Sequence, residues 1–368
     1  MRKRIAIVIP NYRESLTVNE NISLMQAKRL FKNYDIFFIL PNSIAIDYGC
    51  IEISEYRYSD EYFSSLRMYS RFMLQPDLYQ EFSDYDYILV YQLDAFAFVD
   101  RINEFCDLGY DYIGAPWLDG VFFKKNERET MWYVGNGGLS LRKVDSFLKW
   151  TEKGDFSPYV DCINEDLLIA AYGFPLLNIA PIDIALSFSF EANYTQCMEL
   201  TKGRIPFGCH AWERYQFFLW KPLIEEQGYI VETPDEKILK FIDLTAEMNN
   251  FCNRQYEKDE LEKLLPSSYT NSTEGIYIWG AGLWGISLMH KLIEKRIPIA
   301  GFIDNDNRRW GNTILSYKIL NPVLLKNQKE AVIVAIKKGV SQVETQLQKY
   351  GYREELDYTI LQKKFKKH

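Results

Sequence analysis

The first hundred residues alternate between short apolar segments and helical patterns, and this alternation limits the fold more than any other feature. The segments Ile5–Pro10, Asp35–Leu40 and Tyr87–Tyr91 are apolar and rich in β-branched or aromatic residues, which is typical of buried strands. After the first of them, Thr17-x-x-Glu20 is a capping-box pattern that predicts the start of a helix. Strands that alternate with helices favour a mostly parallel sheet covered by helices.

The same alternation restarts near residue 276, after a polar segment at 265–273 that is typical of a linker. The strand-like segment Ile276–Trp279 precedes a helical pattern, and a second strand-like segment, Ile299–Ile303, follows it. A chain of 368 residues is long enough for two domains. The sequence therefore predicts an α/β domain at residues 1–225, a helical extension and linker at 226–273, and a Rossmann-like α/β domain at 274–368.

Composition excludes several classes of protein. Hydrophobic residues make up 47% and charged residues 25%, as in ordinary globular proteins. The formal net charge of −7 argues against a nucleic-acid binder, which usually carries a basic surface. Apolar runs stay well short of the roughly 20 residues needed to span a bilayer. Six cysteines without a C-x-x-C pair indicate reduced thiols, so we expect a cytoplasmic protein.

The strand-like segment Tyr87–Tyr91 leads directly into Gln92-Leu93-Asp94. Carboxylates at the carboxyl ends of strands in open α/β sheets face the ligand crevice. Oxygen ligands suit Mg²⁺ and Mn²⁺, so Asp94 is a candidate for holding a divalent metal against a diphosphate. The usual motif has two acids separated by one residue, and here Gln92 takes the place of the first. The alternative is that Asp94 is only a cap or a turn residue.

A glycine-rich segment follows at Val134–Arg142, with three glycines in four positions that allow a ligand to approach the backbone closely. Asn136 in this segment would hydrogen-bond a sugar, and Trp117 shortly before it would stack on one. The alternative is a tight β-turn. Further on, Glu165 and Asp166 begin a helical pattern. Acids there either cap the helix or supply a catalytic base.

His210 is the only histidine in the first 289 residues, and it lies between Cys209 and a segment containing Trp212. A histidine flanked by glycine, cysteine and tryptophan is a candidate ligand for a metal or a phosphate. The alternative is a histidine that is simply packed in the core.

The order of these elements resembles the GT-A type of glycosyltransferase: a strand-end acid, a glycine-rich loop, Glu-Asp at a helix start and a late histidine. More closely, the segments YDYILVYQLDAF, GYDYIGAPW, VGNGGLSLR, NED and PFGCHAW resemble an uncharacterised family of bacterial GT-A-like glycosyltransferases found in surface-polysaccharide loci. The resemblance covers roughly residues 3–220. It implies a GT-A-like mixed, mostly parallel sheet flanked by helices.

The resemblance also implies roles for residues. Asp94 and His210 would bind a divalent metal, Mn²⁺ or Mg²⁺, although Gln92 leaves metal dependence open. Asp166 would be the catalytic base, with Glu165 as the fallback, and a base in this place implies inversion at the anomeric carbon. Residues that would contact the donor are Asp94, Gln92, Pro10, Arg71, Gly137 and Gly138. Residues that would contact the acceptor are Trp117, Asn136 and Trp212.

The second domain contains a G-x-G-x-x-G pattern at Gly280, Gly282 and Gly285, which follows a strand, opens a helix and precedes Asp304 at the end of the next strand. This context is what a dinucleotide fingerprint requires. The domain is only half the usual size, so two interpretations stay open: a structural or dimerising domain, and a nucleotide-binding one. Every candidate catalytic group lies before residue 215, so we expect residues 1–265 to function without the second domain.

The sequence thus predicts a glycosyltransferase that uses a nucleotide-sugar donor and a glycan or lipid-linked acceptor, in surface-polysaccharide or glycoprotein-glycan synthesis. The lysine-rich tail at 363–367 is by default solvated, and contact with an anionic membrane is the alternative. Homo-oligomerisation is left open. Two other function classes compete: an NAD(H)- or nucleotide-binding oxidoreductase, and a non-catalytic glycan- or nucleotide-binding protein.

Overall fold

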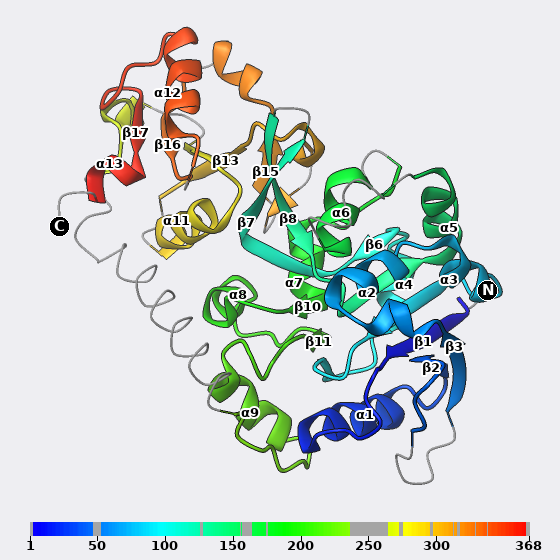
Figure 1. Cartoon of the computed structure of the whole chain (residues 1–368). Helices are drawn as coiled ribbons and strands as arrows, with labels where there is room; N and C mark the ends of the chain where they lie inside the picture. Colours follow the sequence, from blue (N-terminus) through cyan, green and yellow to red (C-terminus); the bar gives the residue numbers. More distant parts are fainter. Residues whose placement is uncertain are drawn as a thin grey trace. The chain divides into compact units, whose positions relative to one another are not determined.

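The computed structural model describes most of the chain, in two units (Figure 1). The described residues are 3–46, 53–125, 128–154, 156, 164–173, 176–235, 264–271, 275–294, 297–311, 313–314, 317–327, 329–336 and 338–365. Unit 1 comprises Met1–Pro116, Val134–Ala180 and Ile184–Thr245, and unit 2 comprises Trp117–Tyr133, Pro181–Asp183 and Ala246–His368. Most of the predicted helical extension, residues 236–263, lies outside the described residues.

Unit 1 is built on a mixed six-stranded sheet. The strand order is β3 (Ser54–Tyr58), β2 (Asp35–Pro41), β1 (Ile5–Pro10), β4 (Tyr87–Tyr91), β9 (Leu139–Lys143) and β6 (Tyr112–Ile113). The first four strands are parallel, and β9 runs antiparallel to both of its neighbours. The predicted class, a mixed and mostly parallel sheet with flanking helices, is confirmed.

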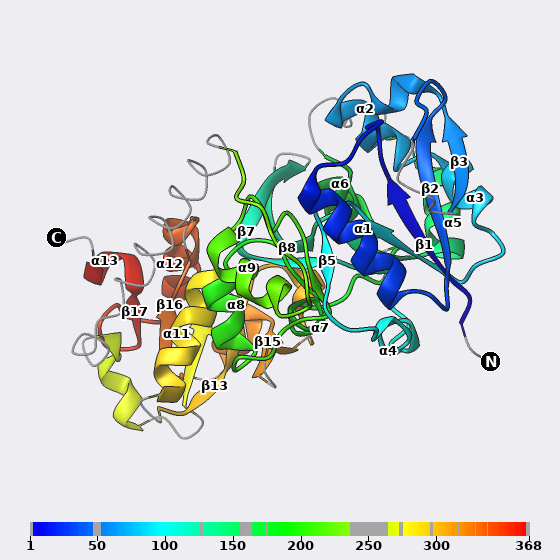
Figure 2. The ribbon, with the colours of Figure 1, turned by 90° about the horizontal axis from the view of Figure 1, so that it is seen from below.

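The helices of unit 1 lie around its two sheets (Figure 2). They are α1 (Val18–Leu30), α2 (Leu66–Phe72), α3 (Pro76–Glu81), α4 (Ile102–Asp107), α5 (Val144–Lys153), α6 (Glu165–Tyr172), α7 (Ile182–Phe188), α8 (Tyr194–Leu200) and α9 (Phe217–Glu225). The predicted capping box is present at α1, where Thr17 and Glu20 each accept a hydrogen bond from the other's backbone N–H. Leu24 of α1 packs in the core with Ile7 and Leu89 of the central strands.

A second, three-stranded sheet in unit 1 has the order β10 (Ser189–Phe190), β11 (Gly208–Cys209) and β5 (Phe96–Ala97). Each strand is only two residues long, so none of them shows a period in the sequence. β10 and β11 are parallel, and β11 and β5 are antiparallel. This small sheet matters because side chains at its edge form the candidate site.

Unit 2 contains a six-stranded α/β sheet with the strand order β14 (Thr313–Ile314), β15 (Tyr317–Leu320), β13 (Ile299–Ile303), β12 (Ile276–Trp279), β16 (Val332–Val334) and β17 (Tyr358–Ile360). All strands except β14 are parallel to their neighbours. From β15 to β17 the order is that of a dinucleotide-binding sheet. The helices are α11 (Leu283–Glu294), α12 (Val340–Lys349) and α13 (Leu361–Phe365).

Unit 2 also includes a β-hairpin from the middle of the chain. Its strands are β7 (Ala115–Lys125) and β8 (Arg128–Gly135), and residues 117–133 group with unit 2. The contiguous ranges expected from the sequence placed this segment in the first domain. A fragment ending at residue 265 would therefore keep the hairpin but lose the sheet with which it groups. Within the part of the chain that is described, no helix has the length and apolar character needed to cross a membrane.

Candidate active site

The sheet of unit 1 has a topological switch point between β1 and β4. The chain runs outward from β1 to β2 and β3 and then returns to β4 on the other side of β1. Ligands of open α/β sheets bind in the crevice outside the carboxyl ends of the strands at such a point. Pro10 is the last residue of β1, and Gln92 and Asp94 lie in the turn after β4, where the N–H of Ala95 donates to the carbonyl of Gln92.

The register of the small sheet brings three polar side chains together there. Cys209 of β11 pairs with Phe96 of β5 and with Phe190 of β10. His210, one residue beyond β11, therefore lies level with Glu191, one residue beyond β10, and beside the turn that holds Asp94. The His210 Nε2 atom is 3.1 Å from Asp94 Oδ1, and its Nδ1 atom is 3.2 Å from Glu191 Oε1.

His210 is held as a cation between the two carboxylates. Its side chain is only 11% exposed, and burial alone would lower the pKa of the imidazole. The charge of Asp94, with hydrogen bonds from the ring to Asp94 and Glu191, outweighs burial and raises the pKa of His210 to about 10. Burial would likewise raise the pKa of Asp94, but the charge of His210 outweighs it and lowers that pKa. At neutral pH, both ring nitrogens of His210 therefore donate.

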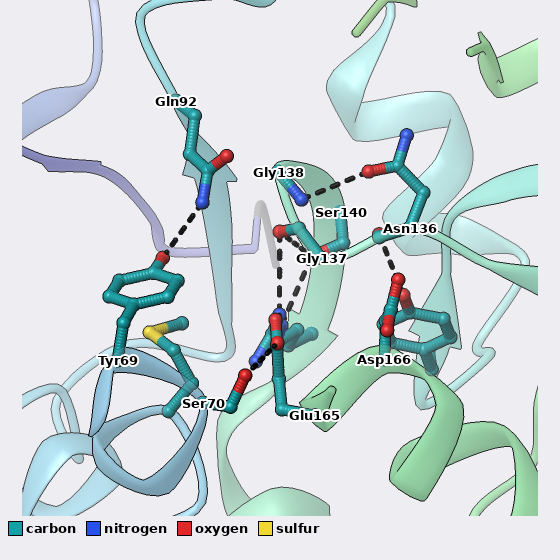
Figure 3. Close-up of polar contacts among 12 residues, drawn as sticks. Tyr69, Ser70, Gln92, Asn136, Gly137, Gly138, Ser140, Glu165 and Asp166 are labelled. Atoms are coloured by element: carbon teal, nitrogen blue, oxygen red, sulfur yellow. Dashed lines mark hydrogen bonds and ion pairs between the residues drawn. The ribbon is translucent and has the colours of Figure 1, made fainter. Parts of the chain in front are cut away.

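The glycine-rich segment lies against this cluster because β9 pairs with β4. Tyr91 is opposite Leu139, so Gln92 is level with Gly138, and its backbone N–H donates to the Gly138 carbonyl at 2.8 Å. The Gln92 side chain donates from Nε2 to the hydroxyl of Tyr69 at 3.1 Å (Figure 3), and its Oε1 atom is 3.2 Å from His210 Nε2. A Cβ at Gly138 would lie 2.0 Å from His210 Nε2. Any larger residue at this position would force the His210 ring to move.

Asn136 adopts the left-handed conformation, with φ of 71°, which asparagine tolerates better than most residues. Its Oδ1 atom accepts a hydrogen bond from the Gly138 N–H at 3.0 Å (Figure 3), and its backbone carbonyl accepts one from the hydroxyl of Tyr112. Because Oδ1 faces an N–H group, the other end of the amide is Nδ2, which is buried without a partner among the described residues. Asn136 thus has an unused donor beside the loop.

Glu165 lies beneath the glycine loop in a buried ion pair. Its Oε1 atom is 3.3 Å from Arg142 Nη2, and its Oε2 atom accepts a hydrogen bond from the hydroxyl of Ser70 (Figure 3). Arg142 is fully buried and also donates to Tyr79 and to the carbonyl of Gly137. A buried arginine without its carboxylate partner is strongly destabilising. Glu165 is therefore engaged in holding the loop, which does not fit its predicted role as the fallback base.

Asp166 lies next to Glu165 at the start of α6, as the sequence predicted, but it is only partly buried. Its Oδ1 atom accepts a hydrogen bond from the Leu167 N–H, and the structure shows no ion pair for it with any described residue. Burial, followed by the charges of Glu165 and Glu191, raises the pKa of Asp166 to about 7. A carboxyl group with such a pKa exchanges protons readily near neutral pH, as a general acid or base must.

The donors at the strand end are suited in kind to a divalent cation. Asp94 offers a carboxylate oxygen, Gln92 an amide oxygen and His210 an imidazole nitrogen, which are ligands that Mn²⁺ accepts. Two observations weaken the fit. The Nε2 atom of His210 donates to Asp94 instead of presenting a lone pair, and the described residues contain no group of three or more His, Cys, Asp or Glu placed to hold a metal.

Three other residues were predicted to contact ligands, and their contacts to a ligand stay predictions. Trp212 is fully buried and stacks on Phe217. Trp117 belongs to unit 2. Arg71 lies in the last turn of α2, where its carbonyl accepts a hydrogen bond from Gln75.

The structure adds residues that the sequence analysis missed. Glu191 follows a two-residue strand and has no motif around it, so only the register of the small sheet reveals its contact with His210. Arg142 was noted only as the end of the glycine-rich segment. The strand reads Leu-Ser-Leu-Arg-Lys, and this alternation of apolar and polar residues would place Arg142 on a solvent-facing side, so no local pattern signals its buried partner.

Two family profiles match parts of the chain. One, described as "Protein of unknown function (DUF5672)", matches residues 52–210, a range that contains Asp94, Asp166, Glu191 and His210. The other, described as "C2185-like, N-terminal", matches residues 272–356. No curated protein matches the chain.

Solved glycosyltransferase structures show weak similarity to the chain. The galactosyltransferase LgtC, solved with donor and acceptor sugar analogues, is 13% identical with a TM-score of 0.39, covering 64% of this chain and 100% of LgtC. The bifunctional glycosyltransferase WbbM is 10% identical with a TM-score of 0.39, covering 66% and 52%. A glycosyltransferase involved in glycosylation of the major capsid of PBCV-1 is 10% identical with a TM-score of 0.34, covering 56% and 93%. TM-scores this low do not establish a shared fold or activity.

Proposed function

We propose that the chain is a glycosyltransferase that transfers a sugar from a nucleotide-sugar donor. The observation that carries the proposal is the grouping of Asp94, His210, the Gly137–Gly138 loop and Asp166 in unit 1. Asp94 lies at the switch-point crevice, where open α/β sheets bind nucleotides. Glu191, which pairs with His210, is also one of the charges that raise the pKa of Asp166, after burial and Glu165. That the transferred group is a sugar is inferred by analogy, from the resemblance of the motifs to GT-A glycosyltransferases.

In this mechanism Asp166 is the catalytic base. Its carboxylate takes the proton of an acceptor hydroxyl while that oxygen attacks the anomeric carbon of the donor. The bond from that carbon to the diphosphate breaks, and the nucleoside diphosphate leaves with the bonding electron pair. Attack from the face opposite the leaving group inverts the anomeric configuration. A pKa near 7 suits this role, because about half of these groups are deprotonated at pH 7 and the carboxylate is more basic than that of an ordinary aspartate.

The charge that develops on the leaving diphosphate needs positive groups or donors near the strand end. The imidazolium of His210 and the unused Nδ2 donor of Asn136 are both available there. The proposal also includes a divalent cation, Mn²⁺ or Mg²⁺, held by Asp94, Gln92 and a deprotonated His210. When bound, such a cation neutralises diphosphate charge.

The acceptor in this proposal is a glycan or a lipid-linked glycan of surface-polysaccharide or glycoprotein synthesis, used on the cytoplasmic side. The lysine-rich tail gives little support for membrane contact, because Lys363 pairs with Glu344 and Glu354 and Lys364 pairs with Glu355. Its last two lysines lie outside the described residues. Homo-oligomerisation stays a prediction.

The test is a panel of nucleotide-sugar donors, scored by release of nucleoside diphosphate with Mn²⁺ and with EDTA. Release that Asp166→Asn abolishes, while donor binding persists, is the expected result. The anomeric configuration of the product then tests inversion. Donor binding without release for every donor and acceptor would favour the competing function, a non-catalytic glycan- or nucleotide-binding protein, for which the missing first acid at Gln92 is the specific argument.

A further inference from the structure

The glycine-rich loop after β12 keeps only part of a dinucleotide fingerprint. In that fingerprint the first glycine makes a tight turn, the second lets the pyrophosphate approach the backbone, and the third allows close packing of helix and strand. Gly280 has φ of +116°, and a Cβ at Gly285 would lie 1.8 Å from the Gly280 carbonyl oxygen. The first and third glycines therefore serve their usual roles in this loop.

The second glycine faces protein where the fingerprint has pyrophosphate. A Cβ at Gly282 would lie 2.7 Å from a ring carbon of Tyr133 and 3.3 Å from the carbonyl oxygen of Leu118. Tyr133 lies in β8 and Leu118 in β7, the two strands of the hairpin (Figure 1). Both residues are buried, Leu118 completely. The space that Gly282 leaves open is filled by the hairpin of the same unit.

The acid of the fingerprint is also engaged by protein groups. Asp304 follows β13, where a dinucleotide-binding acid would hydrogen-bond the ribose. Instead its carboxylate accepts hydrogen bonds from the backbone N–H groups of Ala281 and Asp306, and it pairs with Arg309 at 3.4 Å. The Arg309 guanidinium also donates to the Ala281 carbonyl and lies over the ring of Tyr133. One continuous set of contacts thus joins Asp304, the loop and the hairpin.

We propose that the Gly280–Gly285 loop is the packing site for the β7–β8 hairpin and does not bind a dinucleotide. The Tyr133 ring occupies the position of the pyrophosphate. Arg309 supplies the positive charge that balances the carboxylate of Asp304. The hairpin is continuous with unit 1 at Pro116 and at Val134, directly before the Gly135–Gly138 segment. This inference stands independently of the proposed glycosyl transfer.

The experiment uses the full chain and three variants. Tyr133→Ala removes the ring from the loop, Tyr133→Phe keeps the ring as the matched control, and Gly282→Ala adds a methyl group that must push against it. Hydrogen exchange is followed in peptides from residues 115–135, and NADH binding is followed by fluorescence titration. We expect exchange of the hairpin amides to rise at least about tenfold in Tyr133→Ala and in Gly282→Ala, and to stay near the wild-type rate in Tyr133→Phe.

The expected NADH result is no saturable binding to the wild type. Binding that appears only in Tyr133→Ala would support the proposal, since it would show a loop closed by the hairpin. Saturable NADH binding to the wild type that Gly282→Ala abolishes would overturn it. Unchanged hydrogen exchange of the hairpin in both Tyr133→Ala and Gly282→Ala would overturn it as well. The stability of the hairpin would then not depend on its packing against this loop.

Discussion

The Nε2 atom of His210 lies 3.1 Å from the Oδ1 atom of Asp94, with the Glu191 carboxylate on the other side of the ring. A protonated imidazole thus occupies the strand end at which the sequence predicted a metal. The three groups together carry a formal charge of −1 when His210 is protonated. In the proposed function, the donor either uses this imidazolium or displaces its proton.

Asp94→Ala is expected to abolish donor turnover while leaving the fold intact, because Asp94 lies at the switch-point crevice and its side chain is 42% exposed. The same change should lower the pKa of His210 from about 10, since the largest favourable contribution comes from Asp94. Imidazole proton NMR measures this titration, and the chain has only three histidines to assign. Turnover at the wild-type rate in Asp94→Ala would remove this residue from the mechanism.

His210→Ala is expected to weaken donor binding that depends on Mn²⁺, because Gln92 cannot supply the negative charge of a second acid and another ligand is needed. The measurement is donor affinity by calorimetry with Mn²⁺ and with EDTA. Glu191→Gln is the control, since it keeps a hydrogen-bond acceptor for Nδ1 and leaves Nε2 in place. If EDTA leaves wild-type binding and turnover unchanged, the cation does not take part and His210 acts as an imidazolium.

Asp166→Asn is expected to lower kcat by about 10²-fold or more with little change in donor affinity, because a general base acts in the transition state. Glu165→Gln is the matched control from the neighbouring position. Its main effect should be on stability, because it weakens the buried pair with Arg142. A selective loss of kcat in Glu165→Gln, with Asp166→Asn fully active, would exchange the two assignments.

Asp166 should also make stability depend on pH. Its folded pKa of about 7 lies above the ordinary aspartate value of 3.8, so the folded state holds the proton more tightly than the unfolded state. Below about pH 4 both states are protonated, and stability is then lost as the pH rises to 7. Asp166→Asn should therefore raise the Tm at pH 8 but not at pH 4, by roughly 2–4 °C per kcal/mol. Equal Tm differences at both pH values would contradict this.

Gly137→Ala is expected to destabilise unit 1 and to abolish activity. A Cβ there would lie 1.9 Å from Glu165 Oε1, so the carboxylate would have to leave Arg142. Breaking a buried pair costs about 3–5 kcal/mol. Gly109→Ala is the control, because Gly109 has positive φ but nothing within 4 Å of its Cβ position. Chemical denaturation measures both variants. Gly137 is not among the residues with positive φ, so unchanged stability in Gly137→Ala would contradict the predicted clash with Glu165.

Much of the scaffold could be predicted from the sequence. The apolar segments at β1, β2 and β4 appear with their observed bounds to within a residue, and the capping box at Thr17 is formed as expected. Edge strand β3, with the sequence Ser-Glu-Tyr-Arg-Tyr, was missed because it is half exposed and has no apolar run. The grouping of the hairpin with unit 2 was missed as well, because no local sequence pattern in residues 117–133 predicts which distant segment they join.

The sequence by itself determined the strand–helix alternation, the polar turn at Asp94 and the helix start at Asp166, because apolar periodicity and helix capping depend on near neighbours. The tertiary structure decided which polar groups meet. Glu191 reaches His210 through the register of two-residue strands, Glu165 neutralises Arg142, and Tyr133 fills the space above Gly282. The physical reason is that a buried charge needs a partner, and the space beside a glycine must be filled, by whichever distant segment packs there. Strand pairing selects that segment, and no local sequence pattern encodes it.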